Sequence, residues 1–361
     1  MWRWVLDYLV CPICRAPLAL TESSPDAQQG ALGHLGGRCR ETYPVIDGIP
    51  RLLLGAARSR LRAARCDWFT GNELAKGFTH WELGHGAADL TERVVGRFDR
   101  EWGAFARVGT DEHERLFAQY FDLVSTTDLR ADQVALDVGC GGGRWAHLLE
   151  SKGPRVIALD LGLSVEIAAR NNRQGRVACV QADVVDLPIR DGSIGFAYSL
   201  GVLHHVVGTV TALRRVAVAV RPTGSFLIYV YYRLDGRSGW YHALFRAADV
   251  VRRIASALSQ PLLLALTTFI AATCYFPLAR LAKLLRAVGL RRAADALPLS
   301  FYAELSFETM RNDSLDRFGT TLEKRYTRTE IVMLLDDAGF VDARVSDGPP
   351  YWHAIAKRPP A

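Results

Sequence analysis

The sequence predicts an α/β fold whose doubly wound, largely parallel sheet is covered by helices on both faces. Two observations support this prediction. Short apolar segments alternate with helical segments over residues 133–230, and a glycine-rich turn at 139–143 joins the first apolar segment to a helix. Strands that are apolar throughout are buried on both faces, as in parallel sheets. A chain of 361 residues is long enough for more than one structural unit.

The strands of this sheet are expected at five apolar segments, 134–137, 156–160, 177–180, 196–199 and 225–230. Helices are expected between them at 143–151, 164–172 and 208–220. Near the end of the chain, Thr327 and Glu330 form a capping-box pattern that begins a further helix, and Gly339 ends it. Two closing strands are expected at 341–345 and 353–357.

Three further segments flank or interrupt this core, which we place at 126–232 and 320–361. Residues 1–55 form a small unit, and so small a unit needs a staple, for which a metal is usual inside cells. Residues 56–125 form a helical segment that partly covers the core. Residues 233–319 form a helical insertion, or lid, after the fifth strand.

The composition is that of a globular protein, with 49% hydrophobic and 23% charged residues, which excludes disordered, collagen-like and coiled-coil classes. The net charge is +6, spread along the chain without a run of five like charges, so it gives little support for a nucleic-acid partner. The seven cysteines include one Cys-x-x-Cys, which is typical of a reduced, cytosolic protein with a candidate metal site. The first residues, MWRWVLDYLVCPIC, are not those of a signal peptide.

One apolar segment, 262–279, has 18 residues without a charge, close to the roughly 20 that span a bilayer. Pro277 interrupts it, so we favour a buried helix over a membrane span. A third alternative is an apolar face over a hydrophobic substrate or a membrane surface, with peripheral membrane contact through 254–285.

The glycine turn, Asp137-Val-Gly-Cys-Gly-Gly-Gly143, allows the backbone to approach a ligand closely, and the following helix N-terminus attracts negative charge. The dinucleotide fingerprint Gly-x-Gly-x-x-Gly/Ala is excluded because its sixth position is Arg144. A phosphate-binding Gly-Lys-Ser/Thr loop is absent as well.

This turn resembles motif I of the class I S-adenosylmethionine (SAM)-dependent methyltransferases. Asp160 matches the family's ribose-binding acid, and Asp183 in Gln-Ala-Asp matches its adenine contact. The segment from Ser199 to His205 and the turn at 221–224 resemble the motifs that follow. The resemblance implies a Rossmann-like sheet of seven strands, the last one antiparallel, with SAM as cofactor. The cofactor-binding residues that it implies are Asp137, Gly139, Cys140, Gly141, Gly143, Asp160, Leu161, Ala182, Asp183, Val184 and Ser199.

A general base is expected near the end of the fourth strand, because ligands of open α/β sheets bind at the carboxyl ends of the strands. His204 and His205 are the candidate catalytic residues there, and histidine titrates near neutral pH. Alternatively, His205 packs and hydrogen-bonds the next helix. Candidate walls of the pocket are Tyr231, Tyr232, Tyr326, Tyr351, Trp352 and His353.

The N-terminal unit resembles the Trm112-like zinc-ribbon family in its Cys11-x-x-Cys14, its Cys39 and the Tyr-Pro and Asp-Gly-Ile-Pro segments that follow. The family's third cysteine would fall at Gly36, so three cysteines remain, and His34 is the candidate fourth ligand of a structural zinc. The alternative is a metal-free unit held by packing of Tyr43, Pro44 and Ile49. Zinc is not expected to act in catalysis.

The sequence therefore predicts a cytoplasmic, membrane-associated methyltransferase for a small, hydrophobic acceptor, either natural-product or lipid-like, methylated on oxygen, nitrogen or carbon. An RNA or protein methyltransferase that uses the N-terminal ribbon for binding is the alternative. Nucleic acid is disfavoured because the base-amine motif expected after strand four is replaced by Ser199-Leu-Gly-Val. A SAM-binding scaffold without activity is the third hypothesis.

Overall fold

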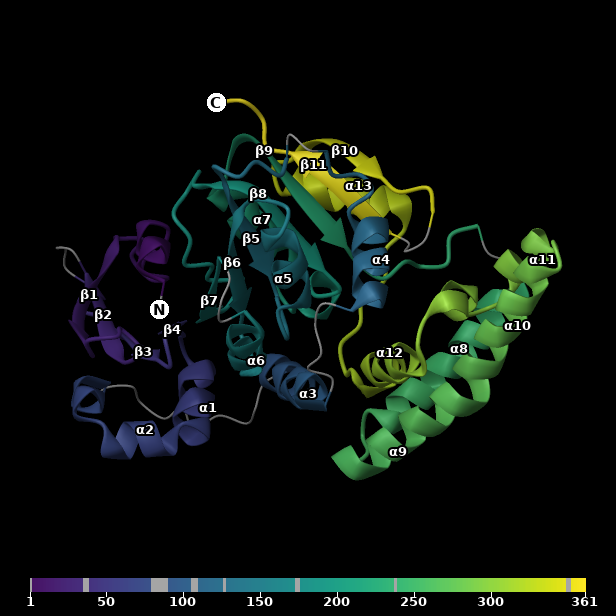
Figure 1. The fold of residues 1–361 in the computed structure, drawn as a ribbon, viewed down its shortest axis with the longest axis horizontal. Helices are drawn as coiled ribbons and strands as arrows, with labels where there is room; N and C mark the ends of the chain where they lie inside the picture. Colours follow the sequence, from purple (N-terminus) through teal and green to yellow (C-terminus); the bar gives the residue numbers. More distant parts are fainter. Residues whose placement is uncertain are drawn as a thin grey trace.

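The computed structural model describes residues 2–34, 39–78, 90–104, 110–125, 128–172, 176–236, 239–348 and 352–361. Figure 1 shows a central sheet with helices on both sides, the N-terminal unit in purple at one edge and a group of green helices at the other. The strands are β1 (Leu18–Ser23), β2 (Gly30–His34), β3 (Tyr43–Ile46), β4 (Ile49–Leu52), β5 (Val134–Val138), β6 (Arg155–Asp160), β7 (Val177–Ala182), β8 (Ile194–Leu200), β9 (Val220–Tyr229), β10 (Val341–Val345) and β11 (His353–Lys357).

The core sheet has seven strands in the order β7-β6-β5-β8-β9-β11-β10. Neighbours from β7 to β9 are parallel, whereas β11 runs antiparallel to both β9 and β10. The predicted Rossmann-like sheet with an antiparallel last strand is therefore confirmed. The five parallel strands are buried almost throughout, which explains their continuous apolar sequence.

The N-terminal unit is continuous with this sheet. Strand β4 pairs in parallel with β7, with Arg51 opposite Gln181 and Leu52 opposite Ala182. Strands β1 to β4 thereby extend the core to an eleven-stranded order. The sequence did not predict this pairing, because β4 is short and carries no signal for its partner.

Helices cover both faces of the sheet and its two ends. The helices are α1 (Ala56–Ala64), α2 (Cys66–Gly71), α3 (Leu90–Ala104), α4 (Asp111–Tyr120), α5 (Arg144–Glu150), α6 (Ser164–Asn171), α7 (Thr209–Ala219), α8 (Gly239–Ala255), α9 (Gln260–Ile270), α10 (Phe276–Ala287), α11 (Arg291–Ala296), α12 (Phe307–Gly319) and α13 (Arg328–Asp337). Thr327 caps α13 in the predicted capping box. Ser306 caps α12 by accepting from the Thr309 N–H.

The apolar segment belongs to one long helix, and this helix is mostly not buried. Helices α9 and α10 join through a π-helical turn, Ala271–Tyr275, into a helix over Gln260–Ala287 that is long and apolar enough to cross a membrane. Only 28% of its most apolar window is buried, so the prediction of a buried helix is wrong. Pro277 does not break the helix, because it lies in the first turn after the π-helical turn.

The buried side of this helix is a narrow stripe. Its members follow one another at a spacing of four residues, and the stripe includes Leu263, Thr267, Ala271, Tyr275 and Ala279. The stripe packs on α12, which in turn lies against α8 and α3. Large apolar side chains elsewhere on the helix are exposed, among them Leu262, Phe269, Leu281 and Leu284. The second half of the helix, α10, also packs on α11 and on the turn at Ser300–Glu304, and the faces that none of these segments covers stay exposed.

Candidate active site and metal centre

The glycine turn after β5 is shaped by three residues with positive φ, Gly139 (79°), Gly141 (51°) and Gly143 (78°). A Cβ on Gly139 would lie 2.5 Å from the methyl groups of Val202, and one on Gly143 would lie 2.7 Å from Asn172 Nδ2. The turn therefore needs glycine both for its backbone conformation and for close contact with its neighbours.

Asp160, at the end of β6, faces this turn. Its Oδ2 accepts from the Gly141 N–H at 2.9 Å and its Oδ1 from the Gly162 N–H at 2.7 Å. Burial raises the pKa of Asp160, and these two N–H groups oppose that rise. Each carboxylate oxygen keeps a further lone pair, so Asp160 is positioned to accept two vicinal hydroxyls.

The end of β7 completes the cofactor side of the site. Asp183 Oδ1 accepts from the Val185 N–H at 2.9 Å, which orients the carboxylate. The Gln181 side chain donates to the carbonyls of Leu161 (3.1 Å) and Gly162 (3.3 Å), and these residues follow Asp160 directly. Gln181 in turn accepts from the buried Arg51 of β4 at 2.8 Å. The N-terminal unit thus supports the backbone beside the candidate ribose site.

A cavity of about 710 Å³ opens along these strand ends, within the size range of small-molecule sites. Eight of the predicted site residues line it: Gly139, Cys140, Asp160, Leu161, Ala182, Asp183, Val184 and His205. The residues that do not line it are Asp137, Gly141, Gly143, Ser199 and His204. The residues predicted at three separate strand ends are therefore brought to one cavity.

The predicted residues outside the lining have buried positions behind it. Burial raises the pKa of Asp137 to about 8, and its side chain lies beneath the glycine turn. Ser199 donates to the carbonyl of Val138 at 2.9 Å. His204 is fully buried, and burial lowers its pKa well below the usual value, so it stays neutral. These residues support the turn and the strand ends from within the core.

His205 has one ring nitrogen bonded and the other turned to the cavity side. Its Nδ1 lies 2.6 Å from the carbonyl oxygen of Leu322, which can only accept, so Nδ1 carries the proton. In the neutral ring Nε2 then holds a free lone pair. Nε2 is buried without a hydrogen-bond partner and lies 3.7 Å from Asp316 Oδ1. The tautomer therefore leaves a proton acceptor in the wall of the cavity.

The predicted pocket walls are confirmed in part. Tyr231 and Tyr232 line the cavity, whereas Tyr326, Trp352 and His353 do not. Tyr351 lies outside the described residues. His353 instead lies 2.7 Å from Asp122 through its Nε2.

The insertion that carries α8 and α12 was predicted as a lid, whereas α3 and α4 were expected only to cover part of the core. All four of these helices line the cavity. They contribute, among others, Thr91, Val94, Phe98, Tyr120, Tyr241, Phe245, Asn312, Asp313, Asp316 and Arg317. Their helical spacing does not say which face meets the core. The one available signal was the dense run of polar residues at 311–317, which is unusual for a helix beside an apolar insertion.

These residues fit SAM. Asp160, whose carboxylate suits the ribose diol, and Asp183, at the next strand end, line one cavity. A glycine turn lies between β5 and the helix that follows it. This fold and this site define a class I SAM-dependent methyltransferase domain.

Comparisons with known proteins agree. Residues 136–228 match the family model of the methyltransferase domain. A phosphoethanolamine N-methyltransferase of Triticum aestivum is 28% identical over 139 residues, or 35% of this chain and 28% of that protein. An uncharacterized methyltransferase of Mycobacterium bovis is 30% identical over 111 residues, or 30% of this chain and 56% of that protein. The chain thus spans less than two thirds of either relative's length.

Among solved structures, human N-acetylserotonin methyltransferase in complex with SAM is similar, with a TM-score of 0.44 and 17% identity. The similarity covers 84% of this chain and 67% of the human chain. The match to the methyltransferase domain spans the core of the present chain from β5 to β9.

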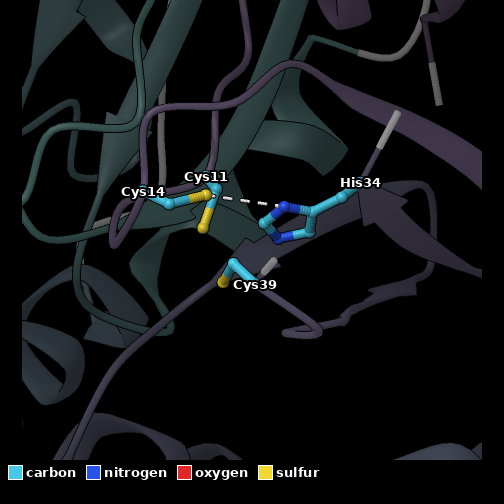
Figure 2. Close-up of side chains that lie close together, drawn as sticks. All are labelled: Cys11, Cys14, His34 and Cys39. Carbon is cyan, nitrogen blue, oxygen red and sulfur yellow. Dashed lines mark hydrogen bonds between the residues drawn. The ribbon is translucent and has the colours of Figure 1, made fainter. Parts of the chain in front are cut away.

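A second candidate site lies in the N-terminal unit. The ligand atoms of Cys11, Cys14, His34 and Cys39 all lie within 4.8 Å of one another. Figure 2 shows the His34 ring turned toward the three sulfurs, and its Nδ1 lies 3.5 Å from Cys14 Sγ. A tetrahedral zinc with usual bond lengths requires about 3.6 Å between a sulfur and a nitrogen ligand. The four side chains could therefore hold a zinc ion.

The packing contacts that were expected for a metal-free N-terminal unit are present as well. Tyr43 is fully buried and its hydroxyl lies 3.2 Å from Cys11 Sγ, while Ile49 is 2% exposed. His34 Nε2 is buried without a hydrogen-bond partner. This cluster lies in the N-terminal unit and contributes nothing to the lining of the large cavity, which suits a structural role for the metal.

Proposed function

We propose that the protein transfers a methyl group from SAM to a small, largely hydrophobic acceptor, natural-product or lipid-like. The observation that carries this proposal is one cavity that joins the candidate cofactor residues to the helical insertion. Apart from the ion pair of Arg286 and Asp295, its walls on the insertion side are mainly apolar or aromatic, with Phe245, Leu297, Leu299, Phe301 and Tyr302. Such a lining favours an acceptor with an apolar body.

SAM, when bound, supplies an electrophilic methyl group on a sulfonium. Asp160 and Asp183 would hold the nucleoside and so fix the direction from which the acceptor must approach. His205 would take the proton of the acceptor's nucleophilic atom through Nε2, as the methyl–sulfur bond breaks and the new bond to methyl forms. Asp316, 3.7 Å from Nε2, would stabilise the resulting imidazolium. The aromatic walls would exclude water.

The shape of the site favours a small acceptor over RNA or protein. The rings of Phe98 and His205, both in the cavity wall, lie 5.0 Å apart, and α3, α8 and α12 all contribute side chains to this wall. A nucleic-acid groove would instead need cations and aromatic rings in an open row.

Titration calorimetry with SAM tests the first step. Methyl-labelled SAM, incubated with the protein and a whole-cell extract, tests the second, since the label is then separated into solvent-extractable, RNA and protein fractions. We expect the label in the solvent-extractable fraction. Label in RNA or in protein would contradict the proposal and support the alternative. Binding of SAM without any transfer would support a scaffold.

The insertion would also bring the protein to an anionic membrane surface. Residues 239–300 hold eight Arg or Lys and two Asp, a net charge of +6 that equals that of the whole chain. The charge is therefore concentrated here rather than spread. Exposed apolar side chains on α8 and on Gln260–Ala287 share this segment, including Trp240, Ile254, Leu262, Phe269 and Leu284. Apolar surface with net positive charge suits anionic lipids.

Flotation with vesicles tests this contact. We expect the protein to float with vesicles of phosphatidylcholine and phosphatidylglycerol, and less with phosphatidylcholine alone. The change of Phe269 and Leu284 to aspartate should abolish flotation, whereas Met333→Asp, an exposed apolar position on α13, should not. Equal flotation of all three proteins would contradict the contact. We propose a cytoplasmic location for the protein, which its free cysteines support.

A further inference from the structure

Helix α12 places a group of polar side chains at the acceptor end of the cavity. We name this group the α12 cluster, and its members are Asn312, Asp313, Asp316 and Arg317. We propose that the α12 cluster binds a neutral, polyhydroxylated head group on the methyl acceptor. This inference rests on the proposed function and names the class of acceptor.

The two carboxylates of the cluster are oriented by tyrosines. Asp313 Oδ2 accepts from the Tyr302 hydroxyl at 2.9 Å, and Asp316 Oδ2 accepts from the Tyr231 hydroxyl. Each carboxylate keeps further lone pairs for a ligand. Since Asp316 Oδ1 also lies 3.7 Å from His205 Nε2, a hydroxyl bound at Asp316 is next to the proposed base.

The other two members have unused hydrogen-bonding capacity. Among the described residues, the Arg317 guanidinium has no hydrogen bond or ion pair, although it carries five N–H donors. Asn312 Oδ1 is buried without a partner. Buried polar groups are rarely left unpaired, so a ligand that both donates and accepts would complete this wall.

The balance of charge decides the class of ligand. An anionic head group would be repelled by Asp313 and Asp316, and a cationic one by Arg317 and the nearby Arg144. The charge of Arg144 lowers the pKa of Asp313 and so opposes the rise that burial causes. Arg325, also in the wall, is already paired with Glu323 at 2.6 Å. A hydroxyl donates once and accepts twice, so a hydroxylated head group satisfies carboxylates and guanidinium together without placing a charge beside a like charge.

The rest of the cavity fits the remainder of such a molecule. Apolar side chains from α3 and from the insertion line the same space, among them Val94, Val95, Leu297 and Leu299. The acceptor is therefore an amphiphile whose hydroxylated head lies at α12 and whose apolar body lies along the insertion. One of its hydroxyl oxygens would be the methylated atom, with its proton passing to His205.

Three amphiphiles with the same octyl chain test the proposal: octyl β-D-glucoside, octyl sulfate and octyltrimethylammonium. Their binding to the full chain with S-adenosylhomocysteine is measured by calorimetry below micelle-forming concentrations. We expect the glucoside to bind at least tenfold more tightly than either charged compound. Equal or tighter binding of a charged compound, or no binding of the glucoside, would overturn the proposal.

Two variants make the test independent of the chosen sugar. Asp313→Asn should shift the preference at least fivefold toward octyl sulfate, and Arg317→Gln should shift it at least fivefold toward octyltrimethylammonium, because each removes one sign of charge. Glu308→Gln, exposed on the same helix, is the matched control and should change nothing. A merely structural role of the cluster would weaken all three ligands together, which would overturn the inference.

The same titrations separate this inference from the proposed function. If S-adenosylhomocysteine does not bind, the proposed function fails. If it binds and the ranking of the amphiphiles or the shifts in the variants differ from those expected, only the nature of the acceptor is wrong.

Discussion

His205 Nδ1 lies 2.6 Å from the carbonyl oxygen of Leu322, and this contact determines what the other ring nitrogen can do. Leu322 follows α12 directly, so the helix that carries the α12 cluster also leads into the residue that sets the tautomer of the proposed base. The acceptor wall and the base are thereby positioned by one segment of chain.

His205→Asn should keep the bond to Leu322, because the asparagine amide can donate as Nδ1 does, yet it supplies no base. We expect kcat for methyl transfer to fall by roughly 10²- to 10⁴-fold. SAM affinity by calorimetry should stay unchanged. The control is His147→Asn, a partly exposed histidine on α5. Full activity of His205→Asn would exclude His205 as the base.

Asp160→Ala should weaken SAM binding. The loss of a charge-assisted contact to the ribose hydroxyls is expected to cost about 1.5–3 kcal/mol, or roughly ten- to 150-fold in Kd. Asp132→Ala, at an exposed acid just before β5, is the control. If Asp160→Ala binds SAM as well as the unchanged protein does, the ribose is held elsewhere.

Metal removal tests the N-terminal cluster. We expect one zinc ion per chain by elemental analysis, lost in Cys14→Ser and retained in Cys66→Ser, whose thiol is exposed away from the cluster. Removal of the metal by a chelator should lower the thermal midpoint, because binding to a folded site stabilises it. If the purified protein holds no zinc and the chelator leaves its stability unchanged, the result would instead support a metal-free unit held by the packing of Tyr43 and Ile49.

Arg51→Met tests the link between the N-terminal unit and the cofactor side. Arg51 is fully buried and joins Glu166 at 2.9 Å and Gln181 at 2.8 Å. Its loss should lower the free energy of unfolding by about 3 kcal/mol and also weaken SAM binding, since Gln181 supports the backbone after Asp160.

The matched control for this change is Arg65→Met. Arg65 is the second partner of Glu166 at 2.6 Å, and its side chain is 31% exposed. We expect a cost of only about 1 kcal/mol, measured by urea unfolding, and unchanged SAM affinity. Equal effects of the two variants would show that Arg51 acts only through Glu166.

The sequence predicted the core sheet well, because its strands carry their own signals. The apolar strands, the positive-φ glycines and the capping box at Thr327 each follow from local chemistry. The cofactor residues were predicted from the resemblance of the strand-end motifs to those of class I methyltransferases, and a parallel sheet brings such strand ends to one edge. The four donors of the N-terminal cluster were predicted from its resemblance to the zinc-ribbon family, with His34 in place of the missing cysteine.

The remaining features depend on contacts between distant segments. The pairing of β4 with β7 and the burial of Arg51 have no local pattern. The long helix was expected to be buried because of its apolar content, but α12, α11 and the turn at Ser300–Glu304 cover only part of its surface. The family pattern does not state which motif residues reach the surface of the pocket. Asp137, Gly141 and Ser199 were therefore predicted as cofactor-binding residues, although they lie behind the cavity lining.

The position of β4 has a consequence for how the chain folds as it is synthesised. Its partner β7 ends at Ala182, so the N-terminal ribbon emerges from the ribosome with one strand edge open and with Arg51 lacking Gln181 and Glu166. Pro50, which has no N–H, and the shortness of β4 protect that edge from pairing with other chains meanwhile. The ribbon reaches its final form only when the nascent chain closes this long-range contact, a slow type of folding step.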